Sequence, residues 1–354
     1  MRPSISIIIA SRNRASSLRR TLASLARMDV PAGQEVELLL LDNGSTDSTP
    51  AVMAAFSAAH VSARVLYDPE PNKSNALNRA LRAASGTVLL FTDDDVRVPT
   101  DWIEGMTAPI LRGDADAVAG GVRLAASLRR PWMTTTHTLA LADTAGLDPE
   151  APRLVGANMA LHRSVFDRIA GFDPRLGPGR AAVGTHEETL VGLQMAAAGL
   201  RIVSAFDVAV EHHPSPTRLT RGAFAASMDK LGRSDAYLDY HWRHAPASRR
   251  RSAAAAAYWS LRIGARRLLH PFSSRRDEGM SPDEMAWRRF RAYHRQLIAY
   301  VGSARDYDHH GLRPRRPWTS PPADDGPPAD RSGRYRTTTA RRVAVKDSPS
   351  TRTK

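Results

Sequence analysis

The chain has 354 residues, which is enough for one large domain or two smaller ones with a substantial core. It contains no cysteine, so disulfides, thiolate-bound metals and thiol nucleophiles are excluded, and any metal must be held by oxygen or imidazole ligands. The formal net charge of +14 leaves three classes of partner open: nucleic acid, an anionic membrane surface, or phosphorylated small molecules.

Neither a secretory leader nor a membrane span is evident in the sequence. The apolar run at 5–10 is too short for the hydrophobic part of a signal peptide, and polar residues follow it at 11–14. No stretch approaches the roughly 20 apolar residues of a membrane-spanning helix. We therefore expect a cytoplasmic protein, either free or peripheral at the inner face of the cell membrane.

Short apolar runs alternate with helical patterns in the first 122 residues. Strands are predicted at 4–10, 36–41, 64–67, 88–92 and 115–122. Helices are predicted between them, capped by Ser16 or Ser17, by Thr49 ahead of Pro50, and by Thr100, with a further helix at 74–84. This alternation predicts an α/β domain with a mainly parallel, Rossmann-like sheet and right-handed crossovers.

The pattern changes along the rest of the chain. Further strands are predicted at 155–161, 201–204 and 208–211, and helices at 164–170 and 187–198. We expect an α/β domain over 1–218, a basic helical segment over 219–312 and, because apolar residues become scarce, a disordered tail over 313–354.

Polar residues follow three of the predicted strands, at 10–13, 41–47 and 92–95. In open α/β sheets, ligands bind beyond the carboxyl ends of the strands. Asp93-Asp94-Asp95 is the most informative of these segments, because three adjacent carboxylates repel one another unless a cation neutralises them. Carboxylate oxygens suit Mg²⁺ or Mn²⁺. The alternative is a solvated acidic turn, which the position at a strand end makes less favourable.

Three other carboxylates admit two interpretations each. Asp42 ends a strand, where it accepts hydrogen bonds from a base or ribose, or else closes an Asx turn. Glu187 and Glu188 begin a helix after a glycine-rich loop, where one acts as a general base, or else both complement the helix dipole.

The histidines and cations near these segments are equally open from the sequence. His212 and His213 follow a predicted strand and are either metal ligands or ordinary loop histidines. Arg12, Arg14 and Lys73 either pair with phosphates or are simple surface charges.

Several of these features occur together and in a fixed order. The stretches are 6–14 (SIIIASRNR), 40–47 (LLDNGSTD), 73–78 (KSNALN) with 83–86 (AASG), 90–96 (LFTDDDV), and 156–160 (GANMA) through 171–173 (GFD) to Glu187-Glu188 and His212. Each stretch alone is a weak signal, but in this order they resemble the family 2 glycosyltransferases, which have the GT-A fold.

The resemblance implies an inverting transfer of sugar from a UDP-, GDP- or dTDP-sugar to a hydroxyl of a glycan or lipid-linked acceptor, with Mn²⁺ or Mg²⁺. It implies a role in polysaccharide, glycolipid or cell-envelope glycan synthesis. Residues 1–122 would bind the nucleotide sugar, and 123–218 would carry the acceptor and catalytic half. No nucleic acid partner is expected, because the predicted pocket is acidic and the arginines concentrate elsewhere.

The resemblance also assigns roles to individual residues. The general base is Glu188, where the family usually has Asp, with Glu187 beside it; a further family acid is replaced here by Leu190. These departures support an alternative, a nucleotide-sugar-binding protein with weakened catalysis. His213 competes with His212 for the metal. The remaining assignments are Ala10, Arg12, Asn13, Arg14, Asp42, Lys73, Asn78, Asp93 and Asp94 for the donor, and Asp93, Asp95 and His212 for the metal.

The helical segment carries a second distinctive pattern. Arginines at 249–251 precede the alanines at 253–257, and then come Tyr258, Trp259 and Leu261. Aromatic and aliphatic residues between arginine clusters are typical of a helix that lies in a membrane interface. The alternative is that the apolar residues pack on the α/β domain while the arginines face water.

Overall fold

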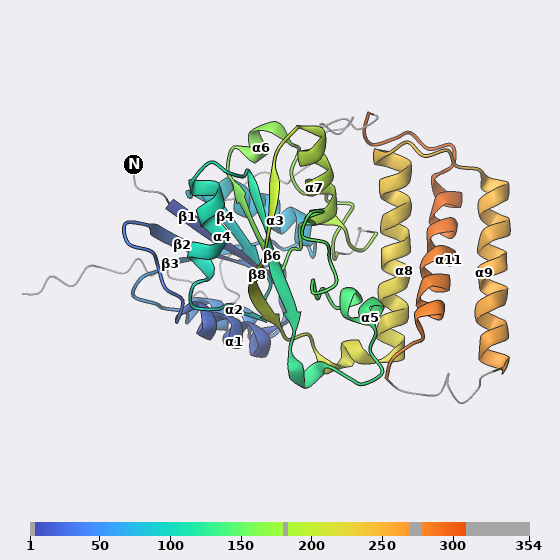
Figure 1. Cartoon of the computed structure of the whole chain (residues 1–354), viewed down its shortest axis with the longest axis horizontal. Helices are drawn as coiled ribbons and strands as arrows, with labels where there is room; N and C mark the ends of the chain where they lie inside the picture. Colours follow the sequence, from blue (N-terminus) through green and yellow to red (C-terminus); the bar gives the residue numbers. More distant parts are fainter. Residues whose placement is uncertain (1–3, 180–182, 270–277, 309–354) are drawn as a thin grey trace, which may run out of the picture. The chain divides into compact units, whose positions relative to one another are not determined.

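One eight-stranded sheet organises the protein. The computed structural model describes residues 4–179, 183–269 and 278–308, all of which belong to one compact unit (Figure 1). The predicted disorder of 313–354 lies outside these residues. The strands are β1 (Ser4–Ser11), β2 (Glu35–Asp42), β3 (Ser62–Tyr67), β4 (Val88–Thr92), β5 (Val96–Arg97), β6 (Ala117–Leu124), β7 (Asn158–His162) and β8 (Ile202–His212).

The strand order in the sheet is β3-β2-β1-β4-β7-β6-β8-β5. The first four strands in that order run parallel to one another, as the sequence predicts, and β6 is parallel to β8. Strand β7 is antiparallel to both β4 and β6, and β5 is antiparallel to β8. The sheet is therefore mainly parallel where β1, β2 and β4 end side by side, and mixed beyond β4.

Helices cover both faces of the sheet because the strand residues alternate between two cores. Ile7 and Ile9 of β1 pack with α1 (Ala15–Leu25), α2 (Thr49–Ala54) and α4 (Trp102–Leu111). Ile8 faces the opposite core with α3 (Lys73–Ala83), α6 (Val165–Arg168) and α7 (Glu187–Ala197). Side chains one residue apart on a strand point to opposite faces, so nearly continuous apolar strands fill both cores.

Several local predictions are wrong in detail. Helix α1 begins at Ala15, so Ser16 and Ser17 lie inside it instead of capping it. The caps of α2 and α4 are Ser48 and Asp101, each one residue from the predicted Thr49 and Thr100. The strands predicted at 201–204 and 208–211 form one strand, β8, whose register with β6 shifts between Gly120 and Gly121. A bulge of this kind interrupts the apolar pattern without ending the strand.

The C-terminal part is helical, as predicted. It contains α8 (Arg221–Tyr237), a π-helical turn η3 (Leu238–Trp242), α9 (Arg249–Leu269) and α11 (Pro282–Tyr300). Helix α11 lies between α8 and α9 (Figure 1). None of the described helices combines the length and the apolar composition that a membrane-spanning helix requires.

Two hydrophobic clusters join these helices to the α/β part. Leu219, Phe224 and Met228 from around α8 pack with Leu124, which ends β6, and with Leu141, which follows α5 (Thr135–Ala140). A second cluster brings Tyr237 and Trp242 against Leu176 and Leu190. The helical segment therefore shares its core with the segments on either side of Glu187-Glu188.

Helices α8 and α11 approach each other closely at one glycine. A Cβ atom placed on Gly232 would lie 2.1 Å from the carbonyl oxygen of Arg289 and 2.9 Å from the amide nitrogen of Tyr293. Toward the start of both helices, the buried carboxylate of Glu284 pairs with Arg221 of α8 and Arg288 of α11. The backbone contact and the paired charge together fix how the two helices meet.

Replacing Gly232 with alanine should therefore force α8 and α11 apart. We expect the free energy of unfolding to fall by about 2–3 kcal/mol, because backbone atoms cannot move aside as a flexible side chain can. The measurement is urea denaturation followed by circular dichroism. Gly264→Ala in α9 is the matched control, since nothing lies within 4 Å of its added Cβ; it should stabilise the protein by up to about 1 kcal/mol. Equal effects of the two changes would contradict the close contact.

Candidate functional site

The carboxyl ends of β1, β2 and β4 meet at one edge of the sheet. Ser11 at the end of β1 is in register with Asp42 at the end of β2. The Ser11 hydroxyl donates a 2.5 Å hydrogen bond to Asp94, which follows β4. In the loops beyond, the backbone nitrogen of Thr46 donates to the side chain of Asn13 at 2.7 Å. Three segments far apart in sequence therefore form one hydrogen-bonded rim.

The predicted donor-binding residues of this rim take different positions. Asp42 is buried and accepts a 3.0 Å hydrogen bond from the backbone nitrogen of Ser45, three residues later in the chain. Ala10 is half-buried, and Arg12 is exposed with its Nε donating to the Gly44 carbonyl at 3.3 Å. Asn78 is buried farther along α3, where its amide makes two hydrogen bonds to the backbone of Phe172, at 2.6 and 3.1 Å.

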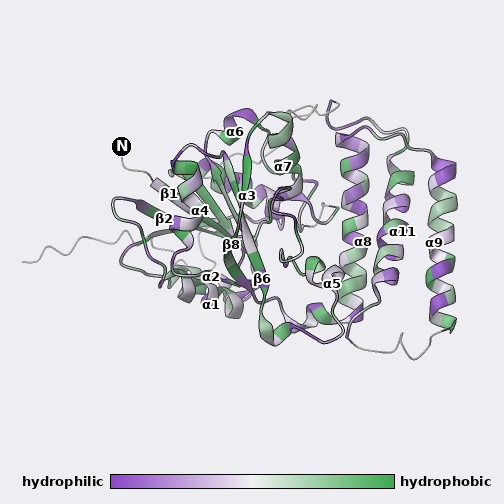
Figure 2. Ribbon diagram, viewed as in Figure 1, coloured by the Kyte–Doolittle hydropathy of each residue, from purple (hydrophilic) through white to green (hydrophobic). Residues whose placement is uncertain are grey.

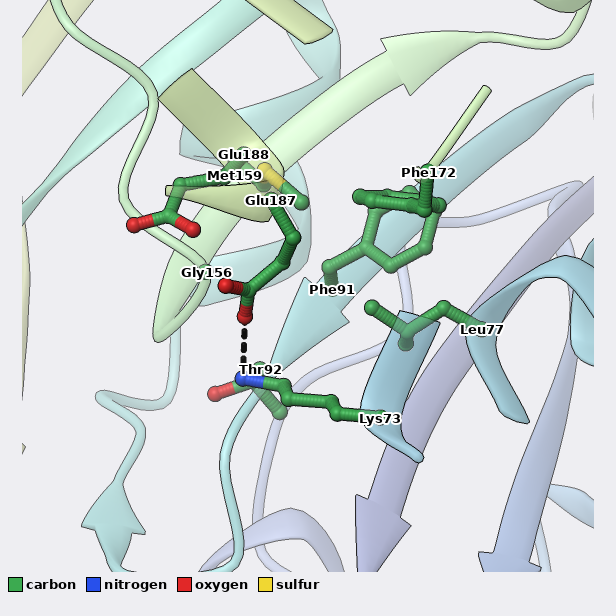
Figure 3. Close-up of a pocket in the computed structure, with 9 residues that line it drawn as sticks. All are labelled: Lys73, Leu77, Phe91, Thr92, Gly156, Met159, Phe172, Glu187 and Glu188. Carbon is green, nitrogen blue, oxygen red and sulfur yellow. Dashed lines mark ion pairs between the residues drawn. The ribbon is translucent and has the colours of Figure 1, made fainter. Parts of the chain in front are cut away.

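Lys73 connects this rim to the start of α7. Its ammonium lies 2.8 Å from Asp93 Oδ1. It also lies 3.5 Å from Glu187 Oε1, the ion pair that the dashed line in Figure 3 marks. Burial opposes the charge of Lys73, but Asp93 and Glu187 outweigh that effect and raise the pKa of Lys73. Lys73 therefore stays protonated and holds together two carboxylates that would otherwise repel each other.

Glu188 is oriented differently from its neighbour. Figure 3 shows the Glu187 carboxylate directed at Lys73 and the Glu188 carboxylate directed away from it. Burial and the adjacent charge of Glu187 raise the pKa of Glu188 well above its usual value, and Lys73 only partly offsets them. Both acids line a small pocket together with Lys73, Leu77, Phe91, Thr92, Gly156, Met159 and Phe172.

The aspartates after β4 sit in contrasting environments. Burial and repulsion from Asp95 raise the pKa of Asp94 to about 7. Asp95 is also buried, but His212 and the guanidinium of Arg14, 4.0 Å away, lower its pKa to about 2. Asp95 therefore keeps a full negative charge at neutral pH, whereas Asp94 is partly protonated there.

The structure separates the two adjacent histidines. His212 is buried, with its Nε2 3.3 Å from Asp95 and its Nδ1 2.8 Å from the carbonyl oxygen of Leu141. His213 instead pairs with Glu211 at 2.9 Å. A carbonyl oxygen can only accept a hydrogen bond, so the Nδ1 of His212 carries the proton and its Nε2 presents a lone pair when the ring is neutral. His212 is thus the histidine that faces the acidic cluster.

This donor set fits a hard divalent cation in part. An imidazole lone pair pointing at a carboxylate needs a proton or a metal ion between them, and one oxygen with one nitrogen ligand is compatible with Mn²⁺. Asp93, the third predicted ligand, is paired with Lys73. Among the residues that the structure describes, no three His, Asp or Glu side chains already surround a common point. Asp95 and His212 would hold the ion, with further ligands from a bound substrate.

The backbone just before Glu187 is strained, and side chains of α8 hold it in place. His186 caps α7 with φ 77°, a left-handed conformation that a residue other than glycine rarely adopts. Its Nε2 lies 3.0 Å from Asp235 of α8. The preceding residue is held as well, since the Thr185 backbone nitrogen donates to Ser234 at 3.0 Å. Strained residues of this kind persist only where their surroundings hold them.

Asp235 is itself held in place by α11. Arg289 of α11 makes two hydrogen bonds to its carboxylate, at 2.6 and 2.9 Å. His186, Arg289 and their hydrogen bonds lower the pKa of Asp235 despite its burial. Sequence reasoning missed this contact, because no local pattern links residue 186 to residue 235.

The domain is identified by comparison with known proteins. Residues 6–170 match the sequence profile described as Glycosyl transferase family 2. This part of the chain is a family 2 glycosyltransferase domain. The resemblance inferred from the ordered motifs is therefore confirmed, and the motif residues from Ser6 to Asp95 all lie inside the matched region.

Individual relatives match over part of their length. Glycosyltransferase AglE of Haloferax volcanii is 31% identical over 121 residues, covering 34% of this chain and 40% of AglE. Glucosyl-3-phosphoglycerate synthase of Mycobacterium tuberculosis is 31% identical over 148 residues, covering 40% of this chain and 43% of the synthase. This chain thus matches less than half the length of either relative.

A solved structure shows that the likeness extends to the fold. Mannosyltransferase PcManGT from Pyrobaculum calidifontis, solved in complex with GDP-Man and Mn²⁺, superposes with a TM-score of 0.53 at 19% identity, covering 85% of this chain and 87% of PcManGT. The predicted GT-A architecture with a helical C-terminal region is confirmed.

If Asp235 holds the strained start of α7, Asp235→Asn should impair turnover more than substrate binding. We expect kcat for release of nucleoside diphosphate from a nucleotide sugar to fall about 10- to 100-fold, because small misplacements of reacting groups have effects of that size. The KM for the donor should stay within about threefold.

Two further variants test the reason for that loss. Asp239→Asn removes an ion pair to Arg243 and leaves one acceptor oxygen for Arg243 and Tyr293 in the same helical segment, and it should leave kcat nearly unchanged. In a His186→Gly background, where glycine adopts the positive φ without strain, Asp235→Asn should have little further effect. Equal losses from the Asp235 and Asp239 variants would indicate general destabilisation instead.

Proposed function

We propose that this protein is an inverting glycosyltransferase, which transfers a sugar from a nucleoside-diphosphate sugar to an acceptor hydroxyl with the help of Mn²⁺ or Mg²⁺. The proposal rests on one observation. The strand-end carboxylates lie close to Glu187 and Glu188 at one edge of the sheet of a family 2 glycosyltransferase domain. Ligands of open α/β sheets bind at this edge.

The rim supplies complementary groups for a nucleoside diphosphate. Asp42 at the end of β2 would accept hydrogen bonds from the base, and Arg14 would pair with phosphate oxygens. Asp95 and His212 would hold the metal, which neutralises the leaving diphosphate when bound. UDP-, GDP- and dTDP-sugars all present the same diphosphate chemistry to these groups.

Glu188 is the better candidate for the general base. Its carboxylate has a raised pKa and is not the one paired with Lys73, so it is both a stronger base and more available to an acceptor hydroxyl. It would take the proton of that hydroxyl while the hydroxyl oxygen attacks the anomeric carbon. Lys73 would keep Glu187 and Asp93 in place during the reaction.

The replacement of a family acid by Leu190 has a packing explanation. Leu190 is fully buried in the cluster that includes Tyr237 and Trp242 from α8 and η3. A carboxylate in that apolar position would have no partner, so leucine suits the covering helices. This favours an active enzyme over the alternative of a nucleotide-sugar-binding protein with weakened catalysis, and measured turnover decides between the two.

The acceptor is proposed to be a glycan or a lipid-linked molecule, in polysaccharide, glycolipid or cell-envelope glycan synthesis. Such acceptors place the enzyme at the inner face of a membrane, which agrees with the positive net charge of the chain. No nucleic acid partner is proposed, because the rim of the site is formed mainly by acidic and neutral residues.

Glu188→Gln tests the catalytic assignment. We expect the rate of transfer, or of donor hydrolysis where no acceptor is supplied, to fall by about two to four orders of magnitude, which is the usual share of a general base. Donor affinity should change by no more than a few fold. Because the neutral amide removes a charge that burial disfavours, the melting temperature at pH 7 should not fall. A larger loss with Glu187→Gln would reverse the roles of the two glutamates.

Asp95→Ala tests the metal site. Binding of nucleoside diphosphate, measured by isothermal titration calorimetry, should lose its dependence on Mn²⁺, because the ion would lose its carboxylate ligand. His212→Ala should weaken Mn²⁺-dependent binding in the same way. His213→Ala is the matched control and should leave it within about twofold, since that ring pairs with Glu211. Unchanged Mn²⁺ dependence in the Asp95 variant would remove Asp95 from the site.

A further inference from the structure

Helix α9 is attached to the protein along one narrow stripe. Of the α9 side chains that the structure describes, Ser252, Ala256 and Ile263 are buried, and they recur at helical spacing on one side of the helix. That side packs on α11, where the Trp259 ring stacks on Phe290 with the ring centroids 5.3 Å apart. Among the three long helices of Figure 1, α9 lies farthest from the sheet. No described segment therefore covers the opposite side of α9.

That outer side is apolar. Tyr258, Leu261, Leu268 and Leu269 are 49%, 73%, 82% and 74% exposed. Together with the exposed alanines at 254, 257 and 265 they form a continuous face at helical spacing, and the C-terminal turn of α9 is coloured hydrophobic in Figure 2. The alternative that these residues pack on the α/β part does not hold for them. Contiguous apolar surface of this kind marks an interaction site.

The described residues of α9 that border this face carry positive charge and no negative charge. Three exposed arginines, 249–251, form the first turn of α9, and the helix contains no Asp or Glu. Along one edge, the guanidinium groups of Arg262 and Arg266 lie 4.6 and 5.9 Å from the ring centroid of Trp287 on α11. Cation–π contacts of this kind hold a charge beside an apolar surface while leaving its outer side accessible.

We propose that the outer face of α9 docks on an anionic membrane surface, with its aliphatic side chains at the boundary of headgroups and acyl chains and its arginines at lipid phosphates. An apolar face bordered by cations is the arrangement that such interfacial helices use. A second copy of the chain fits this face less well, because α9 has no carboxylate to offer the partner's arginines. The proposal sets the location of the proposed transfer, but docking itself needs neither donor nor acceptor.

Vesicle flotation of the full-length protein tests the proposal. Wild type should float with phosphatidylcholine vesicles containing phosphatidylglycerol, but not with phosphatidylcholine alone, and salt should release it. Leu261→Gln with Leu268→Gln should lower the partition coefficient at least about tenfold with every charge unchanged. Reversing Arg250 and Arg251 to Glu should lower it by more than about fivefold for each residue, which is the effect of losing one positive charge near such a surface.

Matched controls keep the same chemistry elsewhere on the molecule. Leu111→Gln with Leu139→Gln changes two exposed leucines outside α9, and Arg19→Glu with Arg20→Glu reverses two exposed charges on α1. Both controls should float as wild type does, and all variants should keep the wild-type circular dichroism spectrum.

Three results would overturn the proposal: no flotation with anionic vesicles at low salt, equal losses in the α9 variants and their controls, or a dimer in sedimentation that the glutamine variant dissociates without any change in flotation. Donor hydrolysis without vesicles should be unaffected by Leu261→Gln with Leu268→Gln. Failure of docking thus stays separate from failure of the proposed enzyme activity.

Discussion

The site depends on keeping several carboxylates close together at one edge of the sheet. The aspartates after β4 lie near Glu187 and Glu188, and like charges so placed oppose folding unless cations lie between them. Lys73, at the first position of α3, provides that cation by contacting both Asp93 and Glu187. It therefore joins the strand ends, where a donor would bind, to the helix that carries the proposed base.

The second constraint comes from outside the α/β part. The strained turn at His186 is held by Asp235, which Arg289 holds in turn, so α8 and α11 reach the start of α7 through side chains. The same helices cover Leu190 and supply the shared core around Tyr237. The helical segment thus contributes to the geometry of the site, and it also carries α9, whose free face is apolar and cationic. Site geometry and the proposed membrane contact belong to one set of packed helices.

Much of the fold and part of the site could be predicted from the sequence because they depend on local patterns. The nearly continuous apolar strands at β1, β2 and β4 are recognisable without tertiary information, and the bounds of β4 were predicted to the residue. Asp93-Asp94-Asp95 directly follows that strand, so its place at the sheet edge followed as well. The errors concern the helix caps and the bulge in β8, where shifts of one to three residues depend on hydrogen bonds that composition does not reveal.

The sequence alone determined that this chain has a GT-A-type domain with acids at its strand ends, since strand alternation and motif order are encoded residue by residue. Only the tertiary structure separated His212 from His213. Strand β5, directly after Asp95, pairs with β8 so that Val96 lies opposite His212, and the strand period of two points neighbouring side chains to opposite sides. Only the packing of α9 on α11 decided which of its residues stay exposed, because a helix with two apolar sides gives the same sequence pattern whichever side is buried.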